Sequence, residues 1–336
     1  MPVPNSEAVV CGLIVADIIG RPIDLANPPP RGSLQLLQEI KLFTGGNVCN
    51  VGIALAKFGV RVAAIGRVGQ DGAGDFVRAE LKRNHVDCRG VRLEPRAQTS
   101  ATVVCVDGSG ERTFFHVLGA NSEVSAADLL HNLPLLRRAK ILVVGYYGML
   151  PSLEPLLPRV LERIKLKTQT RKRPDGIQIA LDTGGSALQS SQLSHLGECL
   201  KHVDYFIPSH DEASALTGRE DPLEILDALQ FAIPNWETSV PTVLGVKRGA
   251  QGCVLREYLE GVIHEHVVSS FPVKRVMDTT GAGDCFLAGF VAARLRGFSV
   301  VQAGRFGNAT GASCIQALGA TAGIRSFAET KKNFGV

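Results

Sequence analysis

Short apolar runs alternate along the chain with longer stretches in which apolar residues recur every three or four positions. The short runs are typical of buried strands and the periodic stretches of amphipathic helices. Because the apolar runs are continuous, they predict a parallel sheet covered on both faces by helices. The predicted strands are Ala8–Ala16, Arg61–Gly66, Ile141–Gly145, Ile177–Asp182, Tyr205–Pro208, Thr242–Lys247 and Gly252–Arg256, and the predicted helices are Asn50–Phe58, Asp75–Asn84, Ala126–Leu136, Leu153–Lys165, Glu212–Thr217 and Gly283–Leu295.

Two predicted strand pairs interrupt this alternation. Ser100–Val106 and Arg112–Leu118 are joined by Asp107–Gly110, whose Asp and Gly residues tolerate the positive φ of tight hairpin turns. Val15–Arg21 and Glu39–Thr44 form a second candidate pair. Four antiparallel strands without helices would make a small lid that excludes water from a site, or else extra edge strands of the main sheet.

Composition sets limits on this picture. The chain has 336 residues and a net charge of +4, with 45% hydrophobic and 20% charged residues. These values are typical of a globular protein, and so small a net charge does not indicate binding to nucleic acid. We therefore expect one large α/β domain over residues 1–336, with a discontinuous lid at about 15–44 and 97–119.

The cysteines and the start of the chain bear on its compartment. The eight cysteines are scattered without a close Cys-x-x-Cys pair, which favours reduced thiols. Residues Met1 to Ile19 lack a basic leader, and Asp17 interrupts their apolar run, which argues against a signal peptide. No stretch reaches the roughly 18 apolar residues of a spanning helix. We expect a cytoplasmic protein that binds a small molecule and neither membranes nor nucleic acid.

The sharpest chemical signal is the segment Asp278–Asp284, Asp-Thr-Thr-Gly-Ala-Gly-Asp, directly before an apolar helix. Gly281 and Gly283 allow a tight turn that presents unpaired N–H groups at the helix start, where anions are attracted. A phosphoryl group in transfer needs such donors. Asp284 would lie beside them and accept the proton of an attacking hydroxyl. Since the helix end also stabilises an ionised carboxylate, we expect Asp284 to orient the hydroxyl more than to remove its proton, and a plain helix cap is the structural alternative.

Two weaker signals suggest a site for hydroxyl groups. Gly45 and Gly46 allow close backbone approach before a predicted helix, in which Asn50 offers both a donor and an acceptor. Asp17 lies at the end of the first apolar run, where a carboxylate needs polar partners. Glycine followed by asparagine is also common at helix starts, so each signal has a structural reading of its own.

Together these segments resemble the ribokinase-like carbohydrate kinases, also called the phosphofructokinase-B family. The resemblance implies the three-layer ribokinase-like fold, a mostly parallel sheet with helices on both faces and a small antiparallel β lid. It covers most of the chain, and the matching segments taken together in this order are far more specific than any single segment. The matching segments are Gly12–Asp17, Gly45–Asn50, Ile65–Gly74, Gly119–Asn121, Val203–Pro208 and Asp278–Asp284.

The resemblance also implies roles for individual residues, with ATP and Mg²⁺ as cofactors and K⁺ as a candidate activator. Turn capping is the structural alternative for the two residues assigned to the monovalent cation. The implied set is Asp284 with the amides of Gly281, Ala282 and Gly283 for catalysis; Asp17, Gly46 and Asn50 for substrate hydroxyls; Lys247, Gly249, Gly252 and Asn308 for ATP; Glu212 for Mg²⁺ through water; and Asp278 and Thr280 for the monovalent cation.

The chain departs from the family pattern at two places. Where the family usually has Asn-x-x-Glu near magnesium, Ser209 stands in the amide position and Glu212 keeps the carboxylate. After the strand Ile141–Gly145, ribokinases proper have a substrate-binding glutamate, whereas this chain continues with Tyr146. The second departure disfavours ribose.

These observations predict a kinase that transfers the γ-phosphate of ATP to a hydroxymethyl group of a ribose- or fructose-type sugar. An adenosine or nucleoside kinase is the alternative within this class, because apolar lid residues such as Phe114 and Phe115 could pack on a base. A sensor that binds sugar or nucleotide without catalysis is the alternative from another class. A homodimer through the lid is expected from its free edges. A sugar phosphate would need a basic anchor, for which the candidates are Arg21, Arg31, Arg96 and Arg112.

Overall fold

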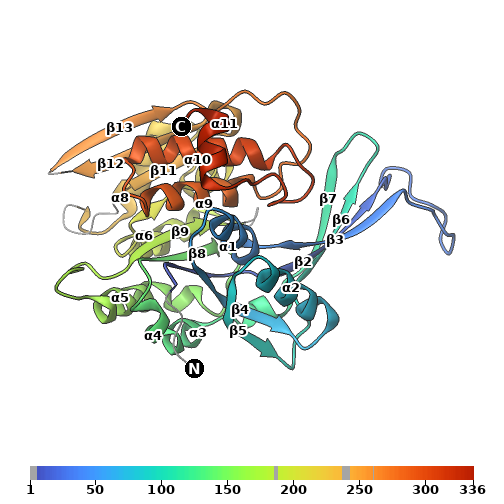
Figure 1. Cartoon of the computed structure of the whole chain (residues 1–336), viewed down its shortest axis with the longest axis horizontal. Coiled ribbons are helices and arrows are strands. Elements are labelled where there is room, and N and C mark those ends of the chain that lie inside the picture. The colour runs from blue at the N-terminus through green and yellow to red at the C-terminus, as the bar shows by residue number, and fades with distance from the viewer. Residues whose placement is uncertain (1–5, 185–187, 237–242, 260) are drawn as a thin grey trace.

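A large sheet with helices on both faces forms the body of the protein, and a smaller sheet projects from one side (Figure 1). The structure, a computed structural model, describes residues 6–184, 188–236, 243–259 and 261–336. Within these residues the main sheet has nine strands in the order β13-β12-β11-β10-β9-β8-β1-β4-β5. Neighbouring strands from β5 across to β11 pair in parallel, whereas the pairs β11–β12 and β12–β13 are antiparallel. The predicted mostly parallel three-layer fold is confirmed.

The strands of the main sheet are rich in buried aliphatic residues. They are β1 (Ala8–Cys11), β4 (Val62–Gly69), β5 (Asp87–Glu94), β8 (Ile141–Tyr147), β9 (Gln178–Thr183), β10 (Tyr205–Phe206), β11 (Val243–Lys247), β12 (Cys253–Leu259) and β13 (Val262–Val268). The predicted strand Thr242–Lys247 is confirmed from Val243 onward, and Thr242 lies outside the described residues. The sequence did not predict the edge strands β5 and β13, because the polar residues along them break up the apolar run.

Alternate positions along the strands fill two separate cores. Val10, Ala64 and Tyr205 belong to one core, and Val9, Ile65 and Phe206 belong to the other. The first core is covered by α1 (Asn47–Lys57), α2 (Gly72–Arg83), α9 (Ala282–Arg294), α10 (Val300–Cys314) and α11 (Phe327–Phe334). The second is covered by α3 (Ala126–His131), α4 (Leu133–Leu136), α5 (Leu157–Thr168), α6 (Leu193–Leu200), α7 (His210–Thr217) and α8 (Pro222–Ala232).

The predicted strand Ala8–Ala16 is wrong in its extent, because the chain leaves the main sheet after β1 and enters the smaller sheet as β2 (Val15–Arg21). Asn47 holds the connection: its Oδ1 accepts from the Leu13 N–H (2.8 Å) and its Nδ2 donates to the Cys11 carbonyl (3.0 Å). The apolar run does not reveal the break, since the residues between β1 and β2 are buried as well. The bend between β1 and β2 is therefore fixed by the side chain of Asn47, which lies 34 positions after Leu13 and 36 after Cys11 in the sequence.

The predicted helix Ala126–Leu136 is likewise interrupted. It forms α3 and α4, which meet at Asn132, with Pro134 in the first turn of α4. Proline has no N–H and is tolerated in the first turn of a helix but not in its interior. The helix therefore restarts at Leu133, with only Asn132 between α3 and α4.

The smaller sheet, called the lid from here on, contains β3 (Glu39–Gly45), β2, β6 (Ala101–Val106) and β7 (Arg112–Val117) in that order. It is a separate sheet, which excludes the alternative of edge strands on the main sheet. Both hairpins are antiparallel as predicted, but they meet through a parallel pairing of β2 with β6. The reason is that β2 and β6 follow β1 and β5, which run in the same direction in the main sheet.

Candidate active site

The start of helix α9 is the centre of the site. Gly281 caps this helix in the left-handed conformation, at φ 74° and ψ 7°, and a Cβ there would lie 2.4 Å from the Cβ of Ala320. Only glycine satisfies both conditions. Ala282 donates its N–H to the Thr279 carbonyl (3.2 Å), whereas within the described chain the amides of Gly281 and Gly283 have no acceptor. The predicted anion hole therefore has two free donors at a helix N-terminus.

Asp284 lies in the first turn of α9 and is buried. Its Oδ2 accepts from Asn50 Nδ2 (2.8 Å) and from the Tyr146 hydroxyl (3.4 Å). Burial raises the pKa of Asp284 and the charge of Glu212 adds to this, while Asn50 and Lys247 oppose it. The carboxylate is consequently a stronger base than the helix end alone would make it, so proton removal gains weight beside orientation of the hydroxyl.

Asn50 stands in the first turn of α1, with its side chain directed at Asp284. It is 2% exposed, and its Oδ1 has no hydrogen-bond partner among the residues that the structure describes. The Asp284 carboxylate can only accept, which assigns the amide orientation and leaves the oxygen free. A buried acceptor without a partner is rare in native proteins and points to a ligand that donates there. This observation supports the predicted role of Asn50 toward a substrate hydroxyl.

Gly46 caps α1 at the point where the lid joins the body. Its φ is 78°, and a Cβ there would lie 2.4 Å from the Leu13 carbonyl oxygen. The glycine is required for this close approach of two backbone segments. Gly46 precedes the helix turn that carries Asn50. A contact between Gly46 and substrate stays a prediction.

Polar residues from the family-like segments hold the base of the lid. Asp71 accepts from the Thr99 hydroxyl (2.6 Å) and the Thr99 N–H (2.7 Å), just before β6. Asn121 forms a pair of hydrogen bonds of 3.1 Å with the backbone of Ile14, just before β2. Together with Asn47, these residues fix where both hairpins leave the body. Their role is structural, since the bonds are all internal.

Asp17 lies on the lid face that turns toward α9. The register of the lid places it on the same face as Arg112, and Arg112 contacts the loop before α9. Burial raises the pKa of Asp17 to about 6, a hydrogen bond from Thr102 lowers it, and the charge of Asp278 raises it further. Near neutral pH this carboxylate is ionised and can accept bonds from substrate hydroxyls.

We expect binding of the acceptor to weaken as the pH falls through about 6, because protonated Asp17 loses acceptor capacity. The pKa is raised, so the loss starts well above the range of an ordinary aspartate. The measurement is the pH profile of kcat/KM for the wild type and for Asp17→Asn, which reports groups of the free enzyme. The acidic limb should vanish in the variant. A limb that persists there would belong to another group, such as His116.

Lys247 ends β11, and its positive charge lies near the carboxylates of Asp182, Glu212 and Asp284. Its Nζ lies 3.1 Å from Asp182 Oδ1 at the end of β9, and a Cβ at Gly283 would lie 3.3 Å from Nζ. Burial alone would lower the pKa of Lys247, but Asp182, Glu212 and Asp284 raise it. The ammonium group therefore stays protonated beside the start of α9.

Three carboxylates surround this single ammonium group. Burial raises the pKa of Asp182, and Glu212 and Asp284 add to that effect while Lys247 opposes it. Burial also acts to raise the pKa of Glu212, but Lys247 and bonds from Ser209 and Thr183 lower it overall. When all are ionised, the cluster carries an excess of negative charge. A divalent cation would offset that excess.

Ser209 and Glu212 form a reciprocal cap at the start of α7. The Ser209 hydroxyl lies 2.8 Å and the Ser209 N–H 2.9 Å from Glu212 Oε2, which also accepts from the Thr183 hydroxyl (2.8 Å). This is a capping box. The serine thus has a local function at the position where the family has asparagine, and within the described residues all the bonds to the Glu212 carboxylate go to Oε2.

The residues predicted to bind ATP follow β11 and lie on α10. Gly249 and Gly252 form the turn between β11 and β12, where Gly252 N–H donates to the Gly249 carbonyl (3.0 Å). Asn308 is buried, and its Nδ2 donates to the carbonyls of Val268 (3.0 Å) and Ser269 (3.1 Å). Asn308 therefore holds the chain after β13. Contact with a nucleotide stays a prediction for all three.

Asp278 and Thr280 are held by a residue of the lid. Asp278 Oδ1 accepts from the Thr280 N–H (2.7 Å) and from Arg112 (2.5 Å), and Oδ2 accepts from the Gly319 N–H (2.8 Å). Arg112 also bonds the Thr280 hydroxyl. A guanidinium group thus occupies the oxygens that the sequence assigns to a monovalent cation.

Two site residues were not predicted. Asp182 ends a buried strand, and the position of charge at a strand end was the available signal. Tyr146 marked a departure from the family but received no role. It has φ 63°, its ring would meet a Cβ at Gly184 within 2.3 Å, and its hydroxyl reaches Asp284. A non-glycine residue in this conformation stores backbone strain of about 1–3 kcal/mol, which is typical of functional sites.

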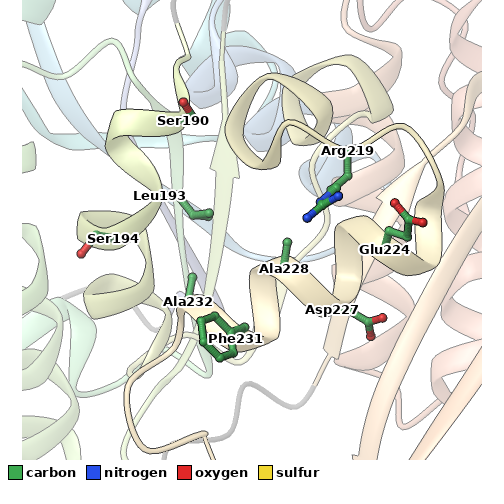
Figure 2. A pocket seen from close by; sticks show the side chains of 9 residues that line it. All are labelled: Ser190, Leu193, Ser194, Arg219, Glu224, Asp227, Ala228, Phe231 and Ala232. Carbon is green, nitrogen blue, oxygen red and sulfur yellow. The ribbon is translucent and has the colours of Figure 1, made fainter.

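A surface hollow of about 970 Å³ lies elsewhere, between α6 and α8 (Figure 2). Figure 2 shows Arg219, Glu224 and Asp227 around it, with the ring of Phe231 at its side. None of the predicted site residues is among its lining residues, which are Ser190, Leu193, Ser194, Arg219, Glu224, Asp227, Ala228, Phe231 and Ala232. We therefore assign it no part in the chemistry.

Among the described residues, no helix is both long and apolar enough to cross a bilayer.

Free helix amides, a buried carboxylate and a buried lysine meet where parallel strands of the main sheet end, an arrangement typical of α/β proteins that act on phosphate groups. The chain belongs to the pfkB family of carbohydrate kinases, whose model matches residues 5–326.

Two relatives and two solved structures are similar to this chain. The ribokinase of Arabidopsis thaliana is 28% identical over 322 residues, covering 93% of this chain and 76% of the relative, and the fructokinase of Klebsiella pneumoniae is 29% identical over 294 residues, covering 86% and 84%. The structure of Arabidopsis thaliana ribokinase with ribose and ATP has a TM-score of 0.81 at 25% identity, covering 98% and 99%. A putative ribokinase II from E. coli, in complex with ATP and Mg²⁺, has a TM-score of 0.77 at 22% identity, covering 97% and 98%.

Proposed function

We propose that this protein transfers the γ-phosphate of ATP to a primary hydroxyl group of a sugar. The observation that carries the proposal is the junction of Asp284, Asn50 and the free amides of Gly281 and Gly283. The carboxylate of Asp284 and the free amides lie at the start of α9, and the side-chain amide of Asn50 on α1 is hydrogen-bonded to that carboxylate. An acceptor hydroxyl held between them would be in line with a bound phosphoryl group.

Each residue has a distinct part in this proposal. Asp284 orients the hydroxyl and takes its proton as the new bond to phosphorus forms. Asn50 Oδ1 accepts a bond from a neighbouring hydroxyl of the sugar. The amides at Gly281 and Gly283, with the ammonium group of Lys247, face the charge of the transferring group. Closure of the lid keeps water from acting as the acceptor.

The residues present fit a magnesium ion bound with the nucleotide. When Asp182, Glu212 and Asp284 are all ionised, they place more negative charge here than Lys247 neutralises. Among the described residues one Glu212 oxygen has no partner and could hold a metal-bound water. In the described chain no set of three His, Cys, Asp or Glu side chains could ligate a metal alone. Phosphate oxygens and water would complete the shell. A magnesium ion held by these residues would supply positive charge that offsets the charge of the phosphates.

A nucleoside kinase is the second candidate, and Phe114 is the observation that favours it. Phe114 pairs with Val104 on the inner face of the lid and is 55% exposed, so its ring is available to stack on a base or a sugar. Phe115 lies on the opposite face, where it cannot contact the site. A sugar phosphate is less well supported, because Arg21 and Arg112 are already paired with Glu39 and Asp278.

The test is ADP release from Mg²⁺-ATP in the presence of pentoses, hexoses, ketodeoxy sugar acids, sugar phosphates and nucleosides. We expect one free sugar to be a strong acceptor. A nucleoside as the strong acceptor would replace the sugar with the second candidate. Tight binding of ATP and a sugar without any ADP would instead support a sensor.

We also propose that two copies of the chain pair through the outer faces of their lids. The register of the strands aligns Leu42, Ile18, Val103 and Phe115 across this face, and each side chain is more than a third exposed. A continuous row of apolar side chains that is exposed to solvent is typical of a protein–protein interface. In a dimer with a twofold axis, the same row of residues on a second lid would pack against this one and cover it.

Solution mass tests the pairing. We expect the wild type to have twice the mass of one chain and Val103→Asp to have the mass of a single chain, because a charge would be buried at the centre of the row. Phe231→Asp, at a residue 94% exposed on α8, is the matched control and should remain paired. A wild type that is monomeric at working concentrations contradicts the proposal.

A further inference from the structure

Arg112 links the lid to the loop that precedes α9. It stands at the start of β7, and its guanidinium bonds Asp278 Oδ1 (2.5 Å) and the Thr280 hydroxyl, 166 and 168 positions further along the chain. The Asp278 side chain is 1% exposed and the Arg112 side chain 13%. This is an ion pair in the interior, between the lid and the turn that precedes α9.

The buried carboxylate of Asp278 needs a positive partner. An ionised carboxylate removed from water is costly unless it is paired and hydrogen-bonded. Burial raises the pKa of Asp278, but the bond from Arg112 and the amides of Gly319 and Thr280 outweigh this and lower it. Asp278 is therefore ionised, and the described residues provide its cation in the form of Arg112.

The same oxygens cannot serve a second cation at the same time. Asp278 accepts three bonds, from Arg112, Thr280 N–H and Gly319 N–H, out of the roughly four acceptor positions of a carboxylate. The Thr280 hydroxyl is also bonded by Arg112. A further positive charge within a few ångströms of the guanidinium would be repelled strongly in this buried setting.

We propose that Arg112 takes the place of a monovalent cation at Asp278, so that the turn before α9 receives its positive charge from the lid. The charge is then part of the chain and does not depend on K⁺. Because Arg112 is on β7, the charge reaches the turn only when the lid is in the position seen here. The inference concerns the same site as the proposed kinase reaction, and its test requires no turnover.

The experiment measures the thermal midpoint in potassium chloride and in choline chloride at equal ionic strength. Wild type is expected to have the same Tm in both salts. Arg112→Gln, which keeps the length and polarity of the side chain without its charge, is expected to have a lower Tm in choline and to regain roughly 2 °C or more in potassium, as the ion fills the vacated place. Arg21→Gln is the matched control, since it also removes a lid arginine from a carboxylate.

The outcomes separate clearly. A potassium response in Arg112→Gln alone supports the proposal. A response in the wild type means that ion and guanidinium occupy different places, and a response in neither protein means that Asp278 does not accept an ion; either result overturns it. A response in Arg21→Gln shows a general effect of losing lid charge and overturns it as well.

A second measurement does not require the variant to fold. Wild-type crystals soaked in rubidium chloride are expected to show no anomalous peak beside Asp278. A rubidium peak within ligand distance of Asp278 and Thr280 would overturn the proposal. Since neither readout uses an acceptor, failure of the proposed kinase activity would leave this test intact.

Discussion

Replacing Asp284 by asparagine is expected to lower kcat by about 10²- to 10⁴-fold. Asparagine keeps the shape of the side chain but cannot take the proton of the acceptor hydroxyl. It also offers an amide where Asn50 Nδ2 and the Tyr146 hydroxyl now donate to a carboxylate. The measurement is ADP release at saturating Mg²⁺-ATP and saturating concentration of the acceptor found in the panel.

Asp75→Asn provides the matched control for this loss. Asp75 is also an aspartate in the first turn of a helix, α2, but its side chain is 82% exposed and remote from the site. Its variant should retain wild-type turnover. If Asp284→Asn also turned over at close to the wild-type rate, Asp284 would have no catalytic role, and positioning by the helix amides alone would have to account for the reaction.

Replacing Lys247 by methionine is expected to destabilise the fold by about 3–5 kcal/mol, because it leaves Asp182 buried without its partner. Methionine has a similar volume, so packing changes little and the loss is mainly electrostatic. Glu212 and Asp284 lose the same compensating charge. The midpoint of unfolding in denaturant measures the change, with the slope serving as a check that the transition is otherwise unaltered.

Two further variants give this prediction its control. Lys201→Met removes a lysine that pairs with Glu198 near the surface, and it should cost no more than about 1 kcal/mol. Adding Asp182→Asn to Lys247→Met should recover part of the loss, since the uncompensated charge is gone. Equal effects at Lys247 and Lys201 would mean that the buried pair contributes no more than an exposed one.

Local signals in the sequence were sufficient to predict the main sheet apart from its edge strands β5 and β13, the lid hairpins and the turn at Gly281. Each depends on a short segment: an apolar run, an Asp-Gly loop, or glycines before an apolar helix. Two predicted elements were wrong in their extent, one because of a long-range contact and the other because of a local proline. The break after Cys11 is made by Asn47, and two helices form in place of one where Pro134 restarts the backbone.

The site shows the same division. Asn50 and Asp284 were predicted from their motifs, and the structure brings them within 2.8 Å of each other across 234 positions. Asp182 was missed although a charge near the end of a buried strand was a signal, because its partner Lys247 lies 65 positions away in the sequence. The pairing of Arg112 with Asp278 joins the lid to the far end of the chain, and no local pattern carries that information.

The way in which the lid is attached limits how it can move. Four covalent connections join it to the body, from β1 to β2, β3 to α1, β5 to β6 and β7 to the turn at Gly119. A sheet held by four strands of chain along one border has little freedom to twist or slide, and tilting about that border is the motion left to it. One of the four connections runs through Gly45 and Gly46 directly into the helix that carries Asn50. A tilt of the lid would therefore displace the start of α1 and change the length of the hydrogen bond from Asn50 to Asp284.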